Sequence, residues 1–199
     1  MPDQIAILLL ASGLSQRFGD GDKLLAILGR QSVLARAAQA VPPHHAGARF
    51  AVVGEDQDDR TRVLKALGYH VVPNPTPEAG QGNSLSIGIR HVRDHTDADA
   101  VLVLLGDMPF VTGTHVSALM QGLDAGATAV MSETDGVLLP PAAFRRQHFD
   151  DLGRITGDSG ARKLFERLHA TRTVIADRGV LLDIDRVEDL TFAEDILNG

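Results

Sequence analysis

The feature that most constrains the fold of this chain is a regular alternation of short apolar runs with longer amphipathic stretches. Two runs, residues 5–10 and 100–105, contain only apolar residues, as is typical of strands buried on both faces of a sheet. Amphipathic stretches between such runs predict helices that connect parallel strands. The pattern therefore predicts an α/β fold: a three-layer, Rossmann-like, mostly parallel sheet with helices on both faces.

Periodicity and capping residues assign the remaining elements. Further strands are predicted at residues 50–53, 69–72, 127–131, 173–176 and 180–184. Helices are predicted at residues 33–41, 60–67, 83–93, 114–123, 160–170 and 187–197. The pattern becomes irregular from about Thr134, but there is no internal repeat and no long linker. We therefore expect one domain over residues 1–199.

Composition excludes several classes of protein. The chain has no cysteine, which excludes disulfides, thiolate metal sites and cysteine nucleophiles. Its net charge of −7, with no Trp and a single Tyr, argues against nucleic-acid binding. The sequence contains no run of 18 apolar residues, so it predicts no membrane-spanning helix. The first apolar run also lacks the preceding basic stretch of a signal peptide. We therefore expect a cytoplasmic protein that binds anions only through local groups.

The segment after the first apolar run is rich in glycine and carries two cations. It reads Ala11-Ser12-Gly13-Leu14-Ser15-Gln16-Arg17-Phe18-Gly19-Asp20-Gly21-Asp22-Lys23. Such a backbone can turn its N–H groups toward an anion, and Arg17 and Lys23 would lie near phosphates. The glycine spacing matches neither the P-loop nor the dinucleotide-binding fingerprint. By composition alone, a solvated surface turn explains the segment equally well.

A second polar segment, Gly106-Asp107-Met108-Pro109, follows the apolar run at residues 100–105. Ligands of open α/β sheets bind beyond the carboxyl ends of the strands, so the two polar segments would meet there. A carboxylate held at the end of a buried strand, beside phosphates, suits Mg²⁺. The alternative is that Asp107 only caps the turn near Thr112–Thr114.

The order of residues in both segments resembles a known family. Leu-x-Ala-Ser-Gly-x-Ser-x-Arg-Phe-Gly, followed by Lys-Leu-Leu, resembles the opening signature of the molybdenum-cofactor nucleotidyltransferases (MobA/MocA-like), and Leu-Leu-Gly-Asp-Met-Pro-Phe-Val resembles their metal-binding motif. The resemblance implies the nucleotide-diphospho-sugar transferase-like fold, with a nucleotide-binding half at about 1–130 and an acceptor-side half at about 131–199. The nearest match is the cytidylyl branch: Ala11-Ser12-Gly13 lacks the second Gly typical of the guanylyl branch, which favours CTP.

The resemblance also implies roles for particular residues. Arg17, Lys23 and Asp107 would be catalytic, and Asp107 with Asp185 would hold Mg²⁺. Asp183 is the alternative second ligand, because alternation along a strand places it on the same face as Asp185. The nucleotide-binding residues implied are Leu10, Ala11, Ser12, Gly13, Ser15, Arg17, Lys23, Gly82, Ser84 and Gly106.

Three segments carry weaker signals. Gly80–Leu85 resembles a family loop that encloses the nucleotide, although capping of a helix by Asn83 or Ser84 explains it as well. Gly157–Arg162 matches a string of the cytidylyl branch, so Asp158, Gly160 and Arg162 would bind the acceptor; an N-cap role explains Asp158 equally well. Gly136–Pro141 departs from the family's Gly-x-Pro, which leaves the acceptor open.

The resemblance thus implies a Mg²⁺-dependent enzyme that transfers CMP from CTP to the phosphate of molybdopterin or molybdenum cofactor, with release of pyrophosphate. A molybdoenzyme or its chaperone would be a transient partner. Three alternatives stay open: a guanylyl- or other transferase acting on a different acceptor such as a sugar phosphate, a non-catalytic molybdopterin carrier, and a flavin-dependent reductase. A carrier is disfavoured by Arg17, Lys23 and Asp107, because it needs neither a triphosphate nor a metal site.

Overall fold

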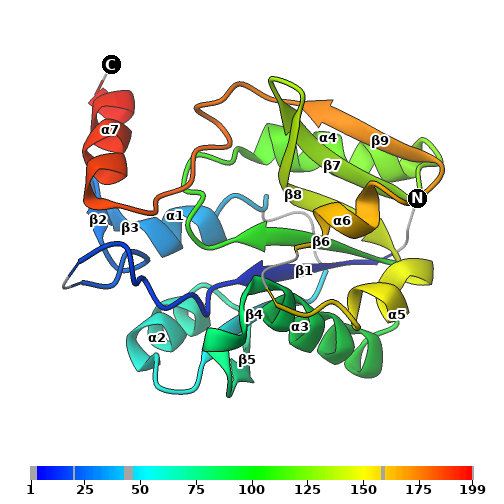
Figure 1. Ribbon diagram of the computed structural model, residues 1–199, viewed down its shortest axis with the longest axis horizontal. Coiled ribbons are helices and arrows are strands. Elements are labelled where there is room, and N and C mark those ends of the chain that lie inside the picture. Colours follow the sequence, from blue (N-terminus) through cyan, green and yellow to red (C-terminus); the bar gives the residue numbers. More distant parts are fainter. Residues whose placement is uncertain (1–3, 20, 43–46, 158–159, 199) are drawn as a thin grey trace.

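The computed structural model describes residues 4–19, 21–42, 47–157 and 160–198, and its centre is a seven-stranded sheet in the order β5-β4-β1-β6-β8-β7-β9 (Figure 1). The strands of this sheet are β1 (Ile5–Leu10), β4 (Arg49–Gly54), β5 (His70–Asn74), β6 (Ala100–Leu105), β7 (Ala129–Thr134), β8 (Val137–Arg145) and β9 (Thr171–Ile175). A separate ribbon consists of β2 (Ile27–Leu28) and β3 (Gln31–Ser32). The predicted runs at residues 5–10 and 100–105 coincide with β1 and β6.

Seven α-helices are present in the part of the chain that is described. They are α1 (Val33–Ala38), α2 (Asp58–Ala66), α3 (Gln81–His95), α4 (Gly113–Asp124), α5 (Phe149–Leu152), α6 (Arg162–Phe165) and α7 (Val187–Asn198). Single 3₁₀ turns lie at η1 (Pro77–Ala79) and η2 (Arg146–His148). None of these helices has the length and apolar character needed to cross a membrane.

Strand β8 runs antiparallel to both of its neighbours, whereas the other pairs in the sheet are parallel. The sheet is therefore mostly parallel, as the sequence predicts. Leu10 and Leu105, the last residues of β1 and β6, are register partners. The segments that follow these two strands consequently leave the sheet side by side, at its carboxyl edge.

The helices form a layer on each face of the sheet. Alternate residues of β1 show this division, because Ile7 and Leu9 pack with α1, α2 and α4, whereas Leu8 packs with α3, α5 and α6. Gly88 lets α3 approach closely, since a Cβ at that position would lie 2.5 Å from a methyl carbon of Leu8. The three-layer α/β prediction is confirmed.

Strand β8 was not predicted, because Pro140 and Pro141 have no N–H group to donate to a neighbouring strand. The structure places both prolines where the β7–β8 register shifts between Met131 and Ser132, and outside the residues that pair with β6. Proline is tolerated in a strand at such an irregularity. The irregular sequence pattern after Thr134 is therefore a bulged strand.

Three local predictions were wrong. Residues 180–184 form turns and irregular chain rather than a strand, and the helix predicted over residues 160–170 is reduced to α6. Asp158, the predicted cap of that helix, lies outside the described residues. Neither Asn83 nor Ser84 caps α3, because this helix begins at Gln81 after Gly80, whose φ of 92° suits glycine.

Candidate active site

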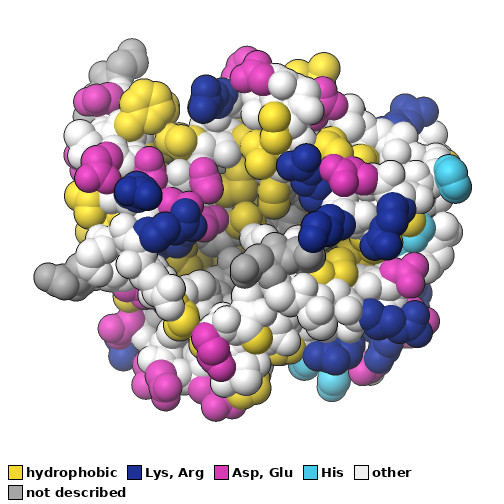
Figure 2. Space-filling view, viewed as in Figure 1, with side chains coloured by type: hydrophobic (Ala, Val, Ile, Leu, Met, Phe, Trp, Pro, Cys, Tyr) yellow, Lys and Arg dark blue, Asp and Glu magenta, His cyan; other side chains and the backbone are white. Residues whose placement is uncertain are grey.

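A cleft of about 510 Å³ opens at the carboxyl ends of β1 and β6, and Figure 2 shows this hollow near the middle of the molecule, with acidic and basic side chains on its left. Its walls come from the segment after β1, the entry to α3, the turn after β6 and the segment before α7. The lining residues are Leu10, Ser12, Gly13, Leu14, Ser15, Gln16, Arg17, Lys23, Pro77, Glu78, Gly80, Gln81, Ser84, Leu105, Asp107, Asp183 and Asp185.

The glycine-rich segment offers unpaired backbone N–H groups beside this cleft. Among the described residues, the N–H groups of residues 12–17 find no hydrogen-bond acceptor. Ser15 has a φ of 54°, so the backbone enters the left-handed region within this run of unpaired N–H groups. Unpaired N–H groups beside a cleft can donate hydrogen bonds to an anion, and the phosphate-binding role of this segment stays a prediction.

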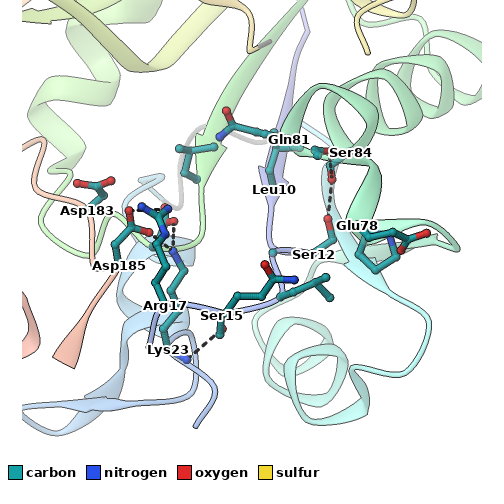
Figure 3. A pocket seen from close by; sticks show the side chains of 17 residues that line it. Leu10, Ser12, Ser15, Arg17, Lys23, Glu78, Gln81, Ser84, Asp183 and Asp185 are labelled. Carbon is teal, nitrogen blue, oxygen red and sulfur yellow. Dashed lines mark hydrogen bonds and ion pairs between the residues drawn. The ribbon is translucent and has the colours of Figure 1, made fainter. Parts of the chain in front are cut away.

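Lys23 lies where the two polar segments meet. Its Nζ donates hydrogen bonds of 2.8 Å to Asp107 Oδ2 and 2.8 Å to Asp185 Oδ1 (Figure 3). Arg17 Nη2 lies 2.9 Å from Asp185 Oδ2, which joins a second cation to the same carboxylate. The side chain of Lys23 is only 11% exposed, whereas that of Arg17 is 66% exposed. The structure thus brings the four predicted residues together at one end of the cleft.

The charges of this group influence one another. Burial opposes the charged form of Lys23, but the carboxylates of Asp107 and Asp185 outweigh it and raise the pKa of Lys23 above its usual value. Burial also opposes ionisation of Asp185, but Lys23 and Arg17 hold the pKa of Asp185 below its usual value. The pKa of Asp183 is raised, because its carboxyl is partly desolvated against the cleft wall and faces Asp107 and Asp185.

The donor set at Asp107 fits a divalent cation. Asp107 Oδ1 is buried and has no hydrogen-bond partner among the described residues, so it can accept a further ligand. Mg²⁺ in nucleotide enzymes is typically held by one or two carboxylates together with phosphate and water oxygens. No cluster of three or more His, Cys, Asp or Glu with metal-binding geometry occurs in the described ranges. Asp107 and Asp185 therefore suit a cation that also takes oxygens from its ligand.

Backbone hydrogen bonds of residues 184–186 fix the position of Asp185. The Ile184 N–H donates 2.9 Å to the carbonyl oxygen of Asp107, which attaches this segment to the end of β6. Asp189 Oδ2 then accepts hydrogen bonds from the N–H groups of Asp185 (2.9 Å) and Arg186 (2.7 Å) at the start of α7. Asp183 lines the same cleft, but among the described residues it is Asp185 that contacts Lys23.

A buried hydrogen-bond network joins the two walls of the cleft. Ser12 Oγ and Ser84 Oγ lie 2.6 Å apart (Figure 3). Asn74 Nδ2 donates 3.1 Å to Ser84 Oγ. All three side chains are almost fully buried. The segment after β1 is therefore attached to the first turn of α3 rather than free in solvent.

The two simpler interpretations of the motifs do not hold. Asp107 is not the cap of the next helix, because Thr112 Oγ1 accepts the hydrogen bond of the His115 N–H at the start of α4. The segment carrying Lys23 is not a solvated turn, since Lys23 is buried between two carboxylates.

Most predicted nucleotide-binding residues line the cleft, and three lie behind its wall. Those behind the wall are Ala11, in the core, Gly82, whose N–H donates to Gly157 O, and Gly106, whose N–H donates to Leu10 O. Those in the lining are Leu10, Ser12, Gly13, Ser15, Arg17, Lys23 and Ser84.

A second cavity of about 220 Å³ adjoins the cleft and shares Leu10, Gln81 and Leu105 with it. Gly160 and Arg162, two of the predicted acceptor-binding residues, line this cavity; Asp158 lies outside the described residues. Arg162 Nε donates 2.8 Å to Glu166 on the molecular surface. The remaining lining residues are Leu85, Val103, Met131, Leu138, Leu139, Pro140, Ala142 and Ala161, so the lining is mainly apolar.

The sequence analysis missed two residues that line the site or contact the glycine-rich segment. Gln81 lines both cavities, and Arg60 on α2 contacts Ala11, Gly13, Ser15 and Asp22 of the glycine-rich segment. A signal for Arg60 was present, because Arg60, Leu64 and Leu67 share one face of the helix at the spacing of an inward-facing stripe. An arginine in such a stripe is buried and needs partners.

Comparison with known proteins agrees with this architecture. Purine catabolism protein PucB of Bacillus subtilis (strain 168) is 36% identical over 115 residues, which are 56% of this chain and 55% of PucB, so the match spans little more than half of that relative. Rv0371c of Mycobacterium tuberculosis H37Rv, also solved in complex with manganese, superposes with a TM-score of 0.80 at 24% identity and covers 98% of this chain and 99% of its own.

A third similar structure is the molybdopterin-guanine dinucleotide biosynthesis protein A of Archaeoglobus fulgidus, with a TM-score of 0.72, 19% identity and coverage of 97% of this chain and 98% of its own. Identities this low establish the fold alone, which is that of the nucleotide-diphospho-sugar transferases, as predicted. The family model for the MobA-like NTP transferase domain matches residues 7–172. This chain therefore belongs to the family of MobA-like NTP transferase domains and is a nucleotidyltransferase.

Proposed function

We propose that this enzyme transfers CMP from CTP to the terminal phosphate of molybdopterin or its molybdenum-loaded form, in a Mg²⁺-dependent reaction in the cytoplasm. The observation that carries the proposal is the meeting of Lys23, Asp107 and Asp185 beside a segment of unpaired N–H groups. Residues 1–130 supply the nucleotide side and residues 131–199 the acceptor side of a single domain. A molybdoenzyme or its chaperone would receive the product by transient contact.

The reaction needs positioning and charge neutralisation rather than a protein nucleophile. An oxygen of the acceptor phosphate forms a bond to the α-phosphorus of CTP, the bond from that phosphorus to the oxygen bridging to the β-phosphorus breaks, and pyrophosphate leaves. The N–H groups of residues 12–17 with Arg17 and Lys23 hold the triphosphate. Asp107 and Asp185 would hold Mg²⁺, which, when bound, neutralises charge on the phosphate oxygens.

Ser12 supports the choice of CTP. Its hydroxyl is tied to Ser84 and Asn74, a network that the second glycine of the guanylyl pattern could not make. The preference for CTP over GTP is tested by competition of the two nucleotides in one turnover assay, where an equal or inverted preference would contradict the cytidylyl assignment.

The second cavity supports an acceptor with a flat ring. Leu138, Leu139 and Met131 offer apolar surface to the faces of a ring, while Gln81 and Arg162 at the edge offer hydrogen-bond donors to polar ring atoms or a phosphate. A sugar phosphate would leave hydroxyl groups unpaired against this lining, at a cost in binding. The name of the Archaeoglobus fulgidus structure, molybdopterin-guanine dinucleotide biosynthesis protein A, is in keeping with a pterin acceptor.

The deciding experiment offers the enzyme an array of nucleotides and acceptors. Incubation with CTP, Mg²⁺ and molybdopterin should release pyrophosphate and yield a pterin–cytosine dinucleotide, detected by mass spectrometry. Mn²⁺ is the natural substitute to try, because the structure of Rv0371c in complex with manganese shows that this metal binds to that protein. Conversion of another phosphorylated acceptor without any pterin dinucleotide would overturn the acceptor assignment and leave the nucleotidyltransferase activity intact.

A further inference from the structure

Arg60 is a buried guanidinium whose five N–H donors are all used. It is 2% exposed and projects from the first turn of α2. Nη1 donates 2.7 Å to Ala11 O and 2.7 Å to Gly13 O, Nε donates 2.6 Å to Asp22 Oδ2, and Nη2 donates to Asp22 Oδ1 and Ser15 Oγ. One side chain thereby contacts the beginning, the middle and the end of the glycine-rich segment.

These contacts determine where the segment's own N–H groups point. The carbonyl oxygen and the following N–H of a trans peptide point in opposite directions. Because the carbonyls of Ala11 and Gly13 are turned onto Arg60, the N–H groups of Ser12 and Leu14 point away from it, and both residues line the cleft. Arg60 therefore orients donors that it does not itself supply.

The Asp22 end of the contact sets the position of Lys23. Asp22 binds Arg60 through both carboxylate oxygens, and its Oδ1 also accepts the Leu24 N–H at 2.9 Å. The Lys23 N–H donates to Ser15 Oγ, which is itself a partner of Arg60. The backbone on both sides of Lys23 is thus fixed to the same guanidinium, while Lys23 Nζ reaches Asp107 and Asp185.

We propose that Arg60, paired with Asp22, is a positioning residue for nucleotide binding: it holds residues 11–19 and 21–23 in the conformation that receives the triphosphate. Arg60 has no donor left for a substrate, so its effect is exerted through the N–H groups and Lys23. The inference depends on the proposed function only in assigning the triphosphate to this segment; it depends on neither the base nor the acceptor.

Lysine cannot replace this arginine. A lysine ammonium has three donors at one point, whereas the contacts of Arg60 need a planar fork that serves a carboxylate on one side and two carbonyls on the other. Arg60→Lys therefore keeps the charge and loses the geometry. Asp22→Asn is a gentler second variant, because the Asp22 side chain is 27% exposed and keeps its shape.

The test measures the Kd of CTP, and of GTP in parallel, by calorimetry with Mg²⁺ present, together with the KM of CTP, the KM of the acceptor and the Tm. Arg60→Lys and Asp22→Asn should each weaken CTP binding roughly ten- to hundredfold and leave the acceptor KM within about twofold. The double variant should bind CTP as tightly as the single variant with the larger loss of affinity, because both changes disrupt the same Arg60–Asp22 pair. The control is Arg62→Lys on the same helix, whose pair with Asp59 is exposed and which should behave as wild type.

The possible outcomes separate the inference from the proposed function. A lower Tm with unchanged nucleotide Kd in both variants would reduce Arg60 to a structural residue and overturn the inference. Additive losses in the double variant would also overturn the pairing with Asp22. If the wild type prefers GTP, the base assignment fails while the test on Arg60 proceeds with GTP. If the wild type binds no nucleoside triphosphate, the inference falls together with the proposed function.

Discussion

The cleft, which we propose binds the nucleotide, and the second cavity beside it, which we propose binds the acceptor, are built in different ways. On the nucleotide side the charged groups are buried and paired, as Lys23 is with Asp107 and Asp185. On the acceptor side the lining is apolar, and the pair Arg162–Glu166 has both side chains about half exposed. A buried charge that loses its partner is strongly destabilised, whereas an exposed pair contributes little. The nucleotide side is therefore specified by charge geometry and the acceptor side by shape.

The largest effect is expected from Asp107→Asn on the nucleotide side. The amide keeps the size of the side chain but removes the charge that faces Lys23 and would hold Mg²⁺. We expect kcat to fall by about 10²-fold or more, the scale for removing one preorganised electrostatic group, with the fold retained. The rate of pyrophosphate release at limiting Mg²⁺ measures this loss of turnover. The control is Asp150→Asn, which changes an exposed carboxylate on α5. Wild-type-like activity of Asp107→Asn would contradict the claim that charge geometry specifies the nucleotide side.

Lys23→Ala and Arg17→Ala should both weaken nucleotide binding, but to different extents. Loss of the buried Lys23 ammonium should cost about 1–3 kcal/mol of CTP binding free energy, the range for hydrogen bonds to charged groups. Arg17→Ala should lie at or below the lower end, because its side chain is 66% exposed. Calorimetry of CTP binding decides this, with the exposed Lys65→Ala as control. Equal losses, or none, would show that burial does not rank the two cations.

On the acceptor side, Leu138→Asn should have a larger effect than Arg162→Ala. The polar amide enters an apolar cavity and should raise the acceptor KM by roughly tenfold, about 1–2 kcal/mol, while the CTP KM stays unchanged. Arg162→Ala should change the acceptor KM only a few-fold, because the arginine is exposed and paired with Glu166. Steady-state kinetics with either substrate varied measure both KM values. A larger rise of the acceptor KM in Arg162→Ala than in Leu138→Asn would mean that charge also specifies the acceptor side.

The smallest effect is on the pH dependence of stability. Burial raises the pKa of Asp22, but the Arg60 guanidinium outweighs it and lowers the pKa below the usual 3.8. The stability from this pair is therefore present above pH 3.8 and is lost as the pH falls through the folded-state pKa. Asp22→Asn should be less stable at neutral pH and show a flatter acid limb in chemical unfolding. An acid limb as steep as that of the wild type would show that the pair is not coupled to folding.

The raised pKa of Lys23 acts at the opposite end of the pH scale. Its stabilising contribution is fully present below pH 10.5 and is lost only as the pH rises through the folded-state pKa. At neutral pH the stabilising contributions of Asp22 and Lys23 are therefore both present.

The nucleotide side could be predicted from the sequence much better than the acceptor side, for physical reasons. Residues 5–10 and 100–105 are continuous apolar runs, and a strand covered on both faces requires such a run, so β1 and β6 were located to the residue. β8 carries two prolines in its middle and is a strand only because β7 shifts register opposite them. Residues 180–184 are mostly apolar, as in a buried strand, yet they form turns and irregular chain. The Ile184 N–H donates to the Asp107 carbonyl oxygen from this irregular chain.

Site residues within a sequence motif could be predicted, whereas residues that join the site through tertiary contacts could not. Lys23, Asp107 and Asp185 were expected near one another, and the structure has their side chains in contact, while their roles in catalysis stay predictions. Arg60 shares a helix face with Leu64 and Leu67, which indicates that it is buried but not which residues it contacts. Its partners lie 38 to 49 residues away in the chain, and no local pattern encodes such a distance.

Asp107 Oδ1, buried without a hydrogen bond, has a consequence for how this chain can evolve. A buried unpaired acceptor lowers the stability of a folded protein by about 1–3 kcal/mol, and this cost applies whenever no cation is bound. Selection for stability alone would replace this aspartate, whereas selection for turnover keeps it. Consensus or library screens that reward thermal resistance should therefore drift away from aspartate at position 107, and homologues that have lost transferase activity should be the ones free to follow.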